Sequence, residues 1–169
     1  MKGKREVVFG GCLFTVFKGR KRLPDGRNAY FEEIDHPGAA LIIPFVKEKI
    51  IFIRQYRGVI EKYIWELPAG IIDPGETPYS CAKRELVEET GYEAEKIKKI
   101  GLIYTTPGFC NEKIHIFRAD CKRDGTGKRD PDELIRVKQM TKDGVRRLFK
   151  NGRISDSKTI AALSFAGIL

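Results

Sequence analysis

The segment that most constrains how this chain can fold is residues 70–92, which read GIIDPGETPYSCAKRELVEETGY. It begins with Gly, Asp and Pro, which favour tight turns. Thr77 then predicts a helix N-cap, Pro78 suits the first helical position, and Gly91 predicts the C-terminal cap. The fold must therefore hold a close turn against the start of a helix of about three turns.

This helix carries three carboxylates on one face. Glu85, Glu88 and Glu89 are spaced i, i+3 and i+4, and like charges at this spacing repel each other. A hard divalent cation would relieve the repulsion, because Mg²⁺ prefers carboxylate oxygens and keeps water molecules for substrate phosphates. Arg84 is a bidentate donor that can orient a neighbouring carboxylate. Taken alone, the spacing also suits a solvated acidic helix face without a metal.

Strands predominate in the rest of the chain, and the pattern of elements favours one mixed α/β domain. Leu23-Pro24-Asp25-Gly26 predicts the turn of an N-terminal hairpin. Two further helices are predicted, one from Thr141 through Phe149 and one that starts at Asp156 or Ser157. The apolar runs predict strands at 7–17 (with a bulge at Gly10-Gly11), 28–34, 39–46, 49–55, 63–67, 97–104, 113–121 and 134–140.

The composition excludes several classes of protein. The chain has 169 residues, of which 41% are hydrophobic and 33% charged, so it can bury the core of one globular domain. No apolar run approaches the roughly 20 residues that a membrane helix needs, and the first residues do not resemble a signal peptide. Four cysteines lack any C-x-x-C pair and suit a reducing compartment, so we expect a cytoplasmic protein. They are Cys12, Cys81, Cys110 and Cys121.

Segment 70–92 resembles the signature of the Nudix hydrolases: Gly, five residues, Glu, seven residues, Arg-Glu, an aliphatic, any residue, Glu-Glu, any residue, Gly and an aliphatic. Tyr92 departs from the pattern, since an aliphatic is usual there. The resemblance implies a Nudix fold, which is an α/β/α sandwich around a mixed β-sheet, here with an N-terminal antiparallel β-hairpin. It also implies hydrolysis of a nucleoside diphosphate linked to another group X. The matching positions are Gly70, Glu76, Arg84, Glu85, Leu86, Glu88, Glu89 and Gly91.

The resemblance assigns roles to the residues of this segment. Mg²⁺ is the implied cofactor, with Mn²⁺ as a possible substitute. Its implied ligands are the carbonyl of Ala69 and the carboxylates of Glu85, Glu88 and Glu89. Gly70, Glu76 and Arg84 match positions that support the turn and the helix, and we expect them to orient the ligands.

Residues outside the signature resemble the subgroup of ADP-ribose pyrophosphatases. Trp65-Glu66-Leu67-Pro68-Ala69-Gly70 resembles the lead-in of that subgroup, and Asp156-Ser157-Lys158-Thr159 resembles its C-terminal segment. Pro107 lies fifteen residues past Tyr92, where a proline marks the subgroup. A turn proline without that meaning remains an alternative. The implied products of ADP-ribose are AMP and ribose 5-phosphate.

The substrate and the attacking water require further groups. Arg57 matches a family arginine that holds the phosphates, and Arg54 is a second candidate. Alternatively, Arg57 forms an ion pair with Glu61 or Glu66. Glu133 resembles the loop glutamate that acts as base in the subgroup, and Glu112 competes with it; either could instead be a solvated loop acid. The candidates are therefore Arg57 and Arg54 for the phosphates and Glu133 and Glu112 for the base.

Residues 1–37 precede the domain of residues 38–169 and contain the N-terminal strands. Because related enzymes pair through such strands, we expect a homodimer with an active site shared between subunits. Adenine needs an aromatic or cationic surface on which to stack. Candidates in the N-terminal region are Phe9, Phe14, Tyr30 and Phe31, although packing within the protein is an alternative for each.

Three other functions remain open at this stage. The substrate could be another nucleotide sugar, such as GDP-mannose. The chain could be a non-catalytic domain that binds ADP-ribose or nucleic acid, although such domains usually lose signature carboxylates that this chain keeps. The net charge of +9 also permits hydrolysis at RNA ends, which would show a steep salt dependence of binding. We expect a small nucleotide rather than a nucleic acid or a membrane as the partner.

Overall fold

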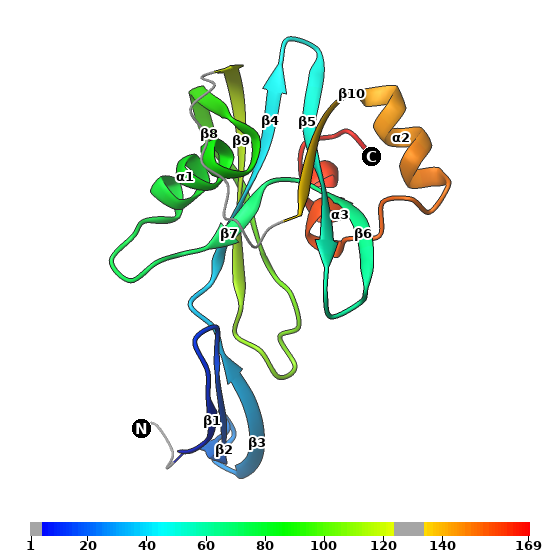
Figure 1. Cartoon of the computed structure of the whole chain (residues 1–169). Coiled ribbons are helices and arrows are strands. Elements are labelled where there is room, and N and C mark those ends of the chain that lie inside the picture. The colour runs from blue at the N-terminus through cyan, green and yellow to red at the C-terminus, as the bar shows by residue number, and fades with distance from the viewer. Residues whose placement is uncertain (1–4, 124–133) are drawn as a thin grey trace.

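The computed structural model describes residues 5–123 and 134–169 (Figure 1). Its helices are α1 (Pro78–Thr90), α2 (Lys142–Lys150) and α3 (Ser157–Phe165). Its strands are β1 (Arg5–Gly10), β2 (Thr15–Arg22), β3 (Asn28–Asp35), β4 (Ala39–Val46), β5 (Lys49–Arg57), β6 (Lys62–Glu66), β7 (Ala69–Ile71), β8 (Tyr92–Tyr104), β9 (Lys113–Arg123) and β10 (Ile135–Thr141). No helix in these ranges is long and apolar enough to cross a membrane.

The strands form a large mixed sheet and a smaller N-terminal one. In the large sheet the order is β10-β5-β4-β9-β8, while β6 pairs with β5 and β7 pairs with β4. Strands β4 and β9 run parallel, and the other described pairs are antiparallel. Strand β4 is therefore the centre of the fold, since it carries β7 along one edge and β9 along the other.

Alternation along β4 divides the core into two layers. Leu41 and Ile43 pack with residues of α2 and α3, whereas Ala40 and Ile42 pack with Cys81, Ala82 and Leu86 of α1. Helix α1 thus covers one face of the sheet, and α2 and α3 cover the other (Figure 1). The predicted α/β/α sandwich is confirmed.

The predicted helix ends are confirmed by their capping contacts. Thr77 accepts a hydrogen bond from the Ser80 amide at 3.1 Å, and Gly91 ends α1 in the left-handed region with φ 71°. Thr141 caps α2 through the Gly144 amide at 3.1 Å, and Asp156 caps α3 through the Thr159 amide at 3.0 Å. Local side-chain chemistry therefore accounts for where all three described helices begin.

Two strand predictions were wrong in ways that affect the architecture. Residues 7–17 form two strands joined by a turn at 11–14, in which the Gly11 amide donates to the Phe14 carbonyl at 3.0 Å. A Cβ at Gly11 would lie 2.8 Å from the Phe9 ring, so glycine permits a reversal where a bulge was expected. The N-terminal sheet consequently has three strands, in the order β1-β2-β3. Strand β7 lies where a loop was expected.

The N-terminal sheet projects from the sandwich and is attached through the loop between β8 and β9 (Figure 1). The Ile34 amide donates to the Phe109 carbonyl at 2.7 Å, and the Asn111 amide donates to the Ile34 carbonyl at 3.2 Å. The Asn111 side chain also accepts from the His36 amide at 2.8 Å. These hydrogen bonds hold the end of β3 and the residue that follows it against the loop between β8 and β9.

Candidate active site

Arg84 lies at the centre of the residues that match the signature. Its guanidinium donates to both oxygens of Glu76, at 3.0 and 2.9 Å, and so fastens the turn of residues 72–77 to α1. It also donates to Glu85 at 2.6 Å, to Glu88 at 3.0 Å and to the Ile71 carbonyl at 3.1 Å. The hydrogen bonds with Glu76 are the main reason that the pKa of Arg84 is raised and that of Glu76 is lowered. Arg84 and Glu76 therefore hold the turn and the helix together.

Gly70 allows α1 to approach β7 closely. A Cβ at this position would lie 1.8 Å from the Oε1 atom of Glu85, so the Glu85 carboxylate fills the space above the glycine. The Cys81 thiol donates to the carbonyls of Gly70 and Ile71, at 3.5 and 3.3 Å. Burial raises the pKa of this thiol to about 12, so Cys81 packs and donates as a neutral group.

Glu89 joins α1 to β7 at Ala69, the residue before Gly70. It is 2% exposed, and its Oε2 accepts a hydrogen bond from the Ala69 amide at 3.1 Å. The backbone of Ala69 thus lies beside a buried carboxylate of α1, while Glu85 lies against Gly70. The structure brings together Ala69, Gly70, Glu76, Arg84, Glu85, Glu88 and Glu89.

The donor set at this site fits a hard divalent cation. Within residues 5–123 and 134–169, no three His, Cys, Asp or Glu side chains are arranged to hold a metal as they stand. At this site, Arg84 lies among the carboxylates. One guanidinium nevertheless faces Asp73, Glu76, Glu85 and Glu88, which leaves an excess of negative charge. Carboxylate and carbonyl oxygens are the ligands that Mg²⁺ prefers, so the site suits a cation of this class.

Arg57 forms the ion pair with Glu66 that the sequence left open. Its Nε and Nη2 atoms each donate to one Glu66 oxygen at 2.7 Å. Glu66 is fully buried and also accepts from Lys158, whose Nζ lies 2.9 Å from the capping carboxylate of Asp156. The Arg57 side chain is therefore anchored by Glu66 and yet remains 39% exposed.

Arg54 lies on the other face of β5 from Arg57, because residues three apart on a strand point to opposite sides. Its guanidinium carbon lies 5.4 Å from the centre of the Tyr63 ring and 5.9 Å from that of Trp65. Opposite Arg54 in the register are Trp65 on β6 and Arg136 on β10. The two arginines therefore lie on opposite faces of β5, and a substrate contact for Arg54 stays a prediction.

The two candidate bases differ in what the structure describes. Glu133 lies outside the described residues. Glu112 precedes β9 by one residue, accepts from the Thr105 hydroxyl at 2.8 Å and lies 3.8 Å from Nδ1 of His36. Ile114 lies opposite Ala39 of β4, which in turn lies opposite Ile71 of β7. Glu112 is therefore at the same end of the sheet as the turn after β7, about 10 Å away across two strand spacings.

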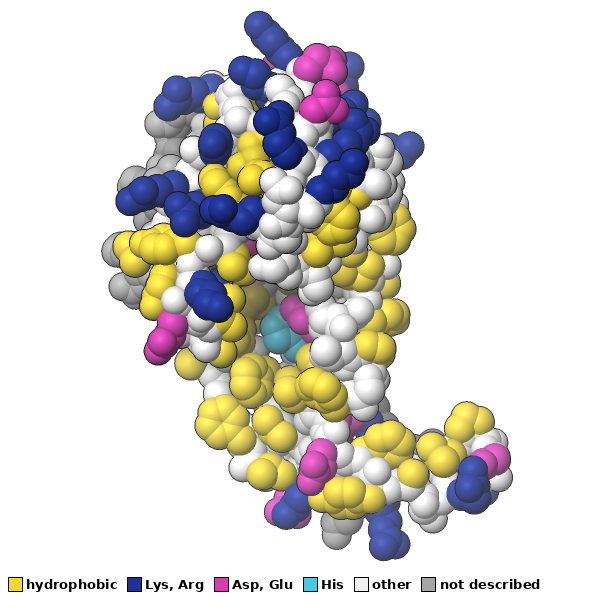
Figure 2. Space-filling view, turned by 90° about the vertical axis from the view of Figure 1, so that its right-hand side faces the viewer, with side chains coloured by type: hydrophobic (Ala, Val, Ile, Leu, Met, Phe, Trp, Pro, Cys, Tyr) yellow, Lys and Arg dark blue, Asp and Glu magenta, His cyan; other side chains and the backbone are white. Residues whose placement is uncertain are grey.

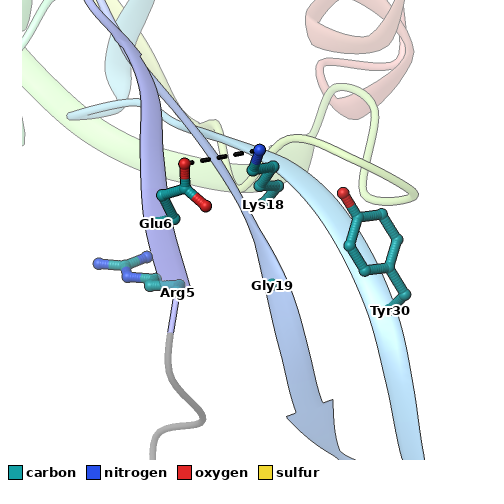
Figure 3. A pocket seen from close by; sticks show the side chains of 5 residues that line it. All are labelled: Arg5, Glu6, Lys18, Gly19 and Tyr30. Atoms are coloured by element: carbon teal, nitrogen blue, oxygen red, sulfur yellow. Dashed lines mark ion pairs between the residues drawn. The ribbon is translucent and has the colours of Figure 1, made fainter.

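The N-terminal sheet carries a cavity of about 630 Å³ on its surface (Figure 3). Glu6 and Lys18 bridge β1 and β2 beside it with a separation of 3.5 Å, and Tyr30 lines it from β3. Arg5 and Gly19 complete the lining. Of the four aromatic candidates, Tyr30 lines this cavity. Phe9 and Phe14 pack against each other and Phe31 lies under Lys21.

Much of the positive charge lies away from the signature residues. In the view onto the side of α2 and α3, Lys and Arg side chains gather at the end remote from the N-terminal sheet (Figure 2). Helix α2 lies on the face of the sheet opposite α1. Part of the net charge is thus separated from the carboxylates of α1 by the sheet. Exposed basic residues in and after α2 are Lys142, Arg146, Arg147, Lys150 and Arg153.

Known proteins resemble this chain over most of its length. A family model described as "NUDIX domain" matches residues 35–163. An ADP-ribose pyrophosphatase of Bacillus subtilis (strain 168) is 37% identical over 164 residues, which cover 95% of this chain and 89% of that protein. A methanol dehydrogenase activator of Bacillus methanolicus is 38% identical over 165 residues, covering 96% and 89%.

A solved structure supports the same fold. The crystal structure titled as that of an ADP compounds hydrolase aligns with a TM-score of 0.81, covering 98% of this chain and 92% of that chain. The sequence identity is 24%, so this likeness concerns the arrangement of helices and strands.

Substitution of Gly70 by Ala should weaken cation binding without unfolding the protein. The added Cβ would displace the end of the Glu85 side chain, which is flexible, so the free energy of unfolding should change by less than about 1 kcal/mol. We expect the affinity for Mn²⁺, measured by titration calorimetry, to fall about tenfold or more. Gly58→Ala is the control, since a Cβ there meets no atom within 4 Å. Unchanged Mn²⁺ affinity in Gly70→Ala would place the cation elsewhere.

Substitution of Glu66 by Gln should alter how stability depends on pH. Burial by itself would raise the pKa of Glu66, but hydrogen bonding to Arg57 and the charge of Lys158 outweigh it and hold the pKa below its usual value. The ionised group therefore stabilises the fold above its unfolded-state pKa of about 4.3, and this contribution is lost as the pH falls through the lower folded-state pKa. At pH 7 the variant should lose about 3 kcal/mol in urea unfolding.

The difference in unfolding free energy between wild type and Glu66→Gln should shrink below about pH 4. Glu48→Gln, at an exposed turn position, is the matched control and should show little difference at any pH. A deficit in Glu66→Gln that stays constant down to pH 3 would contradict the assigned pKa direction.

Proposed function

The chain belongs to the Nudix hydrolase family, and from this premise we propose that it hydrolyses the diphosphate bond of ADP-ribose, yielding AMP and ribose 5-phosphate. The observation that carries the chemistry is the cluster of signature carboxylates around Arg84, pressed against Gly70 and Ala69. The substrate follows from similarity along almost the whole chain to the Bacillus subtilis relative.

We propose Mg²⁺ as the cofactor, with Mn²⁺ as a substitute, held by Glu85, Glu88, Glu89 and the carbonyl of Ala69. A divalent cation bound there would neutralise charge on the diphosphate and lower the pKa of water. Arg84 and Glu76 keep the ligands in place by joining the turn to α1. These contacts exist before substrate arrives, which reduces the reorganisation needed during the reaction.

Arg57 holds the diphosphate in this proposal. The ion pair with Glu66 takes its Nε and one Nη2 hydrogen and orients the guanidinium plane, while its exposed part remains available to an anion. The pKa of Arg57 is raised mainly by its hydrogen bonds to Glu66, and the charge of Glu89 makes a smaller contribution that is consistent with a position near the carboxylates of α1. Arginine suits this task because its planar donors match phosphate oxygens.

Water is the nucleophile, and a loop glutamate accepts its proton. We keep Glu133 and Glu112 as the two candidates. Glu112 lies at the end of the sheet where the turn after β7 is located, and the Thr105 hydroxyl holds it. The base should be identifiable from kcat, because its change to Gln lowers the rate of proton transfer while leaving cation affinity unchanged.

We further propose that residues 1–37 pair two chains and supply the adenine side of the site, while residues 38–169 supply the hydrolytic side. The N-terminal sheet projects from the sandwich and exposes Val7, Val8, Phe9 and Leu13 by 47% to 56% of their surface. The cavity beside Tyr30 and Lys18 offers an aromatic ring and a positive charge to a nucleotide. A second copy of the chain is the occupant that we propose for this apolar surface.

The cysteines support a reducing compartment, and we propose the cytoplasm. All four are free thiols, and Cys81 and Cys121 are buried. Buried thiols of this kind act as small hydrophobic side chains.

Glu89→Gln should abolish turnover while the protein remains folded. The amide oxygen of Gln can still accept from the Ala69 amide, but the charge that would bind the cation is lost. We expect kcat for ADP-ribose to fall at least about 100-fold, as measured by Mg²⁺-dependent phosphate release coupled to a phosphatase. Glu48→Gln should keep the wild-type rate. Full Mg²⁺-dependent activity of Glu89→Gln would overturn the assignment of the cation ligands.

The same assay tests the choice of substrate. It compares ADP-ribose with GDP-mannose, NADH, diadenosine polyphosphates and capped RNA. The proposal requires the highest kcat/KM with ADP-ribose and little effect of salt on its binding. A preference for GDP-mannose would leave the proposed hydrolysis of a diphosphate bond standing but would show that the substrate is another nucleotide sugar. Binding of ADP-ribose without turnover would favour a regulatory domain.

A shared active site predicts that two inactive variants restore activity together. Glu89→Gln damages the hydrolytic side, and Tyr30→Ala should damage the adenine side and lower activity at subsaturating ADP-ribose. After subunit exchange, about half of the dimers should be mixed, each with one intact shared site, so about a quarter of the wild-type activity should return. Light scattering should give twice the 19.2 kDa chain mass. A mixture no more active than the average of the two variants would contradict a shared site.

A further inference from the structure

The buried carboxylate of Glu66 connects α3 to Arg57, the proposed phosphate-binding residue. Glu66, at the end of β6, accepts from Arg57 of β5 on one side and from Lys158 of α3 on the other. The Lys158 side chain is 19% exposed, and its Nζ also donates to Asp156 at 2.9 Å. Two consecutive strands and a helix that lies 92 positions further along the chain therefore share one network of two cations and two carboxylates.

The same first turn of α3 also holds the backbone next to Glu66. Thr159 is fully buried, and its hydroxyl accepts from the Leu67 amide at 2.9 Å. Two residues further along, the Ala69 amide donates to Glu89 of α1. The short segment 66–69 is thus fastened at one end to α3 and at the other to the helix that carries the signature carboxylates.

We propose that Lys158 is a positioning residue for the proposed reaction, acting through Glu66 to keep Arg57 oriented and available for the substrate diphosphate. This inference rests on the proposed function of Arg57. With Lys158 present, the charges of Arg57 and Lys158 balance those of Glu66 and Asp156. Without Lys158, the network would hold one carboxylate more than it holds cations. This extra negative charge would lie beside Arg57 and would oppose the binding of the substrate diphosphate by Arg57.

Charge balance makes the proposal testable with paired variants. Lys158→Met leaves the surplus negative charge, and Lys158→Arg keeps the network neutral. The double variant Lys158→Met with Asp156→Asn restores neutrality, and Asn is a good N-cap residue, so α3 keeps its cap. Lys150→Met at the exposed end of α2 makes the same charge change away from the network and is the control.

Steady-state kinetics and binding are measured together, with ADP-ribose and with ADP as ligands. We expect Lys158→Met to raise KM and Kd about tenfold with kcat within about twofold of wild type. Lys158→Arg and the double variant should return both constants to within about threefold of wild type, and Lys150→Met should not change them. Unfolding midpoints are recorded for every variant, so that a loss of stability is not mistaken for a loss of positioning.

Several results would overturn the proposal. One is a Lys158→Met protein whose Kd and KM match wild type. Another is a weakened Kd that neither Lys158→Arg nor the double variant restores, since that pattern indicates a structural role alone. If the wild type binds ADP-ribose without hydrolysing it, the proposed function fails while the series of Kd values still decides the role of Lys158. A wild type that binds neither ligand would overturn both.

Discussion

The guanidinium of Arg84 is the group on which the arrangement of the candidate site depends. It binds both oxygens of Glu76 and also contacts Glu85 and Glu88, so one side chain joins the turn after β7 to α1. Three carboxylates on one helix face would otherwise repel each other. The arginine reduces this repulsion, and its four acidic neighbours leave enough negative charge to attract a divalent cation.

The candidate site also requires α1 to lie close to the sheet, and the absence of a side chain at Gly70 makes this possible. Glu85 occupies the space over Gly70 that any side chain would fill, and Glu89 binds the amide of Ala69. Segment 66–69 continues from there to α3 through Leu67 and Thr159. Segment 66–69 therefore contacts α1 on one face of the sheet and α3 on the other. The candidate site is held in place from both faces.

The N-terminal sheet carries a cavity on elements other than those that carry the signature carboxylates. It is attached to the sandwich through the loop between β8 and β9 and carries its own cavity. The residues that line that cavity belong to β1, β2 and β3, whereas the signature carboxylates belong to α1. In the proposed homodimer, one chain would supply the cavity and the other the carboxylates, and the exposed apolar residues of β1 would lie in the interface.

Local patterns in the sequence were enough to predict all three described helices with their N-caps, because a cap depends on neighbours in the chain. The α/β/α sandwich and the roles of the signature residues came from the resemblance to the Nudix hydrolases. Local patterns failed at residues 7–17, because glycine at position 11 is compatible both with a bulge in one strand and with a turn between two strands. The sequence could name Glu66 as a possible partner of Arg57 but could not show that it is buried or that Lys158 shares it. Those contacts join β5, β6 and α3, and only tertiary packing brings them together, since residues 66 and 158 are 92 positions apart.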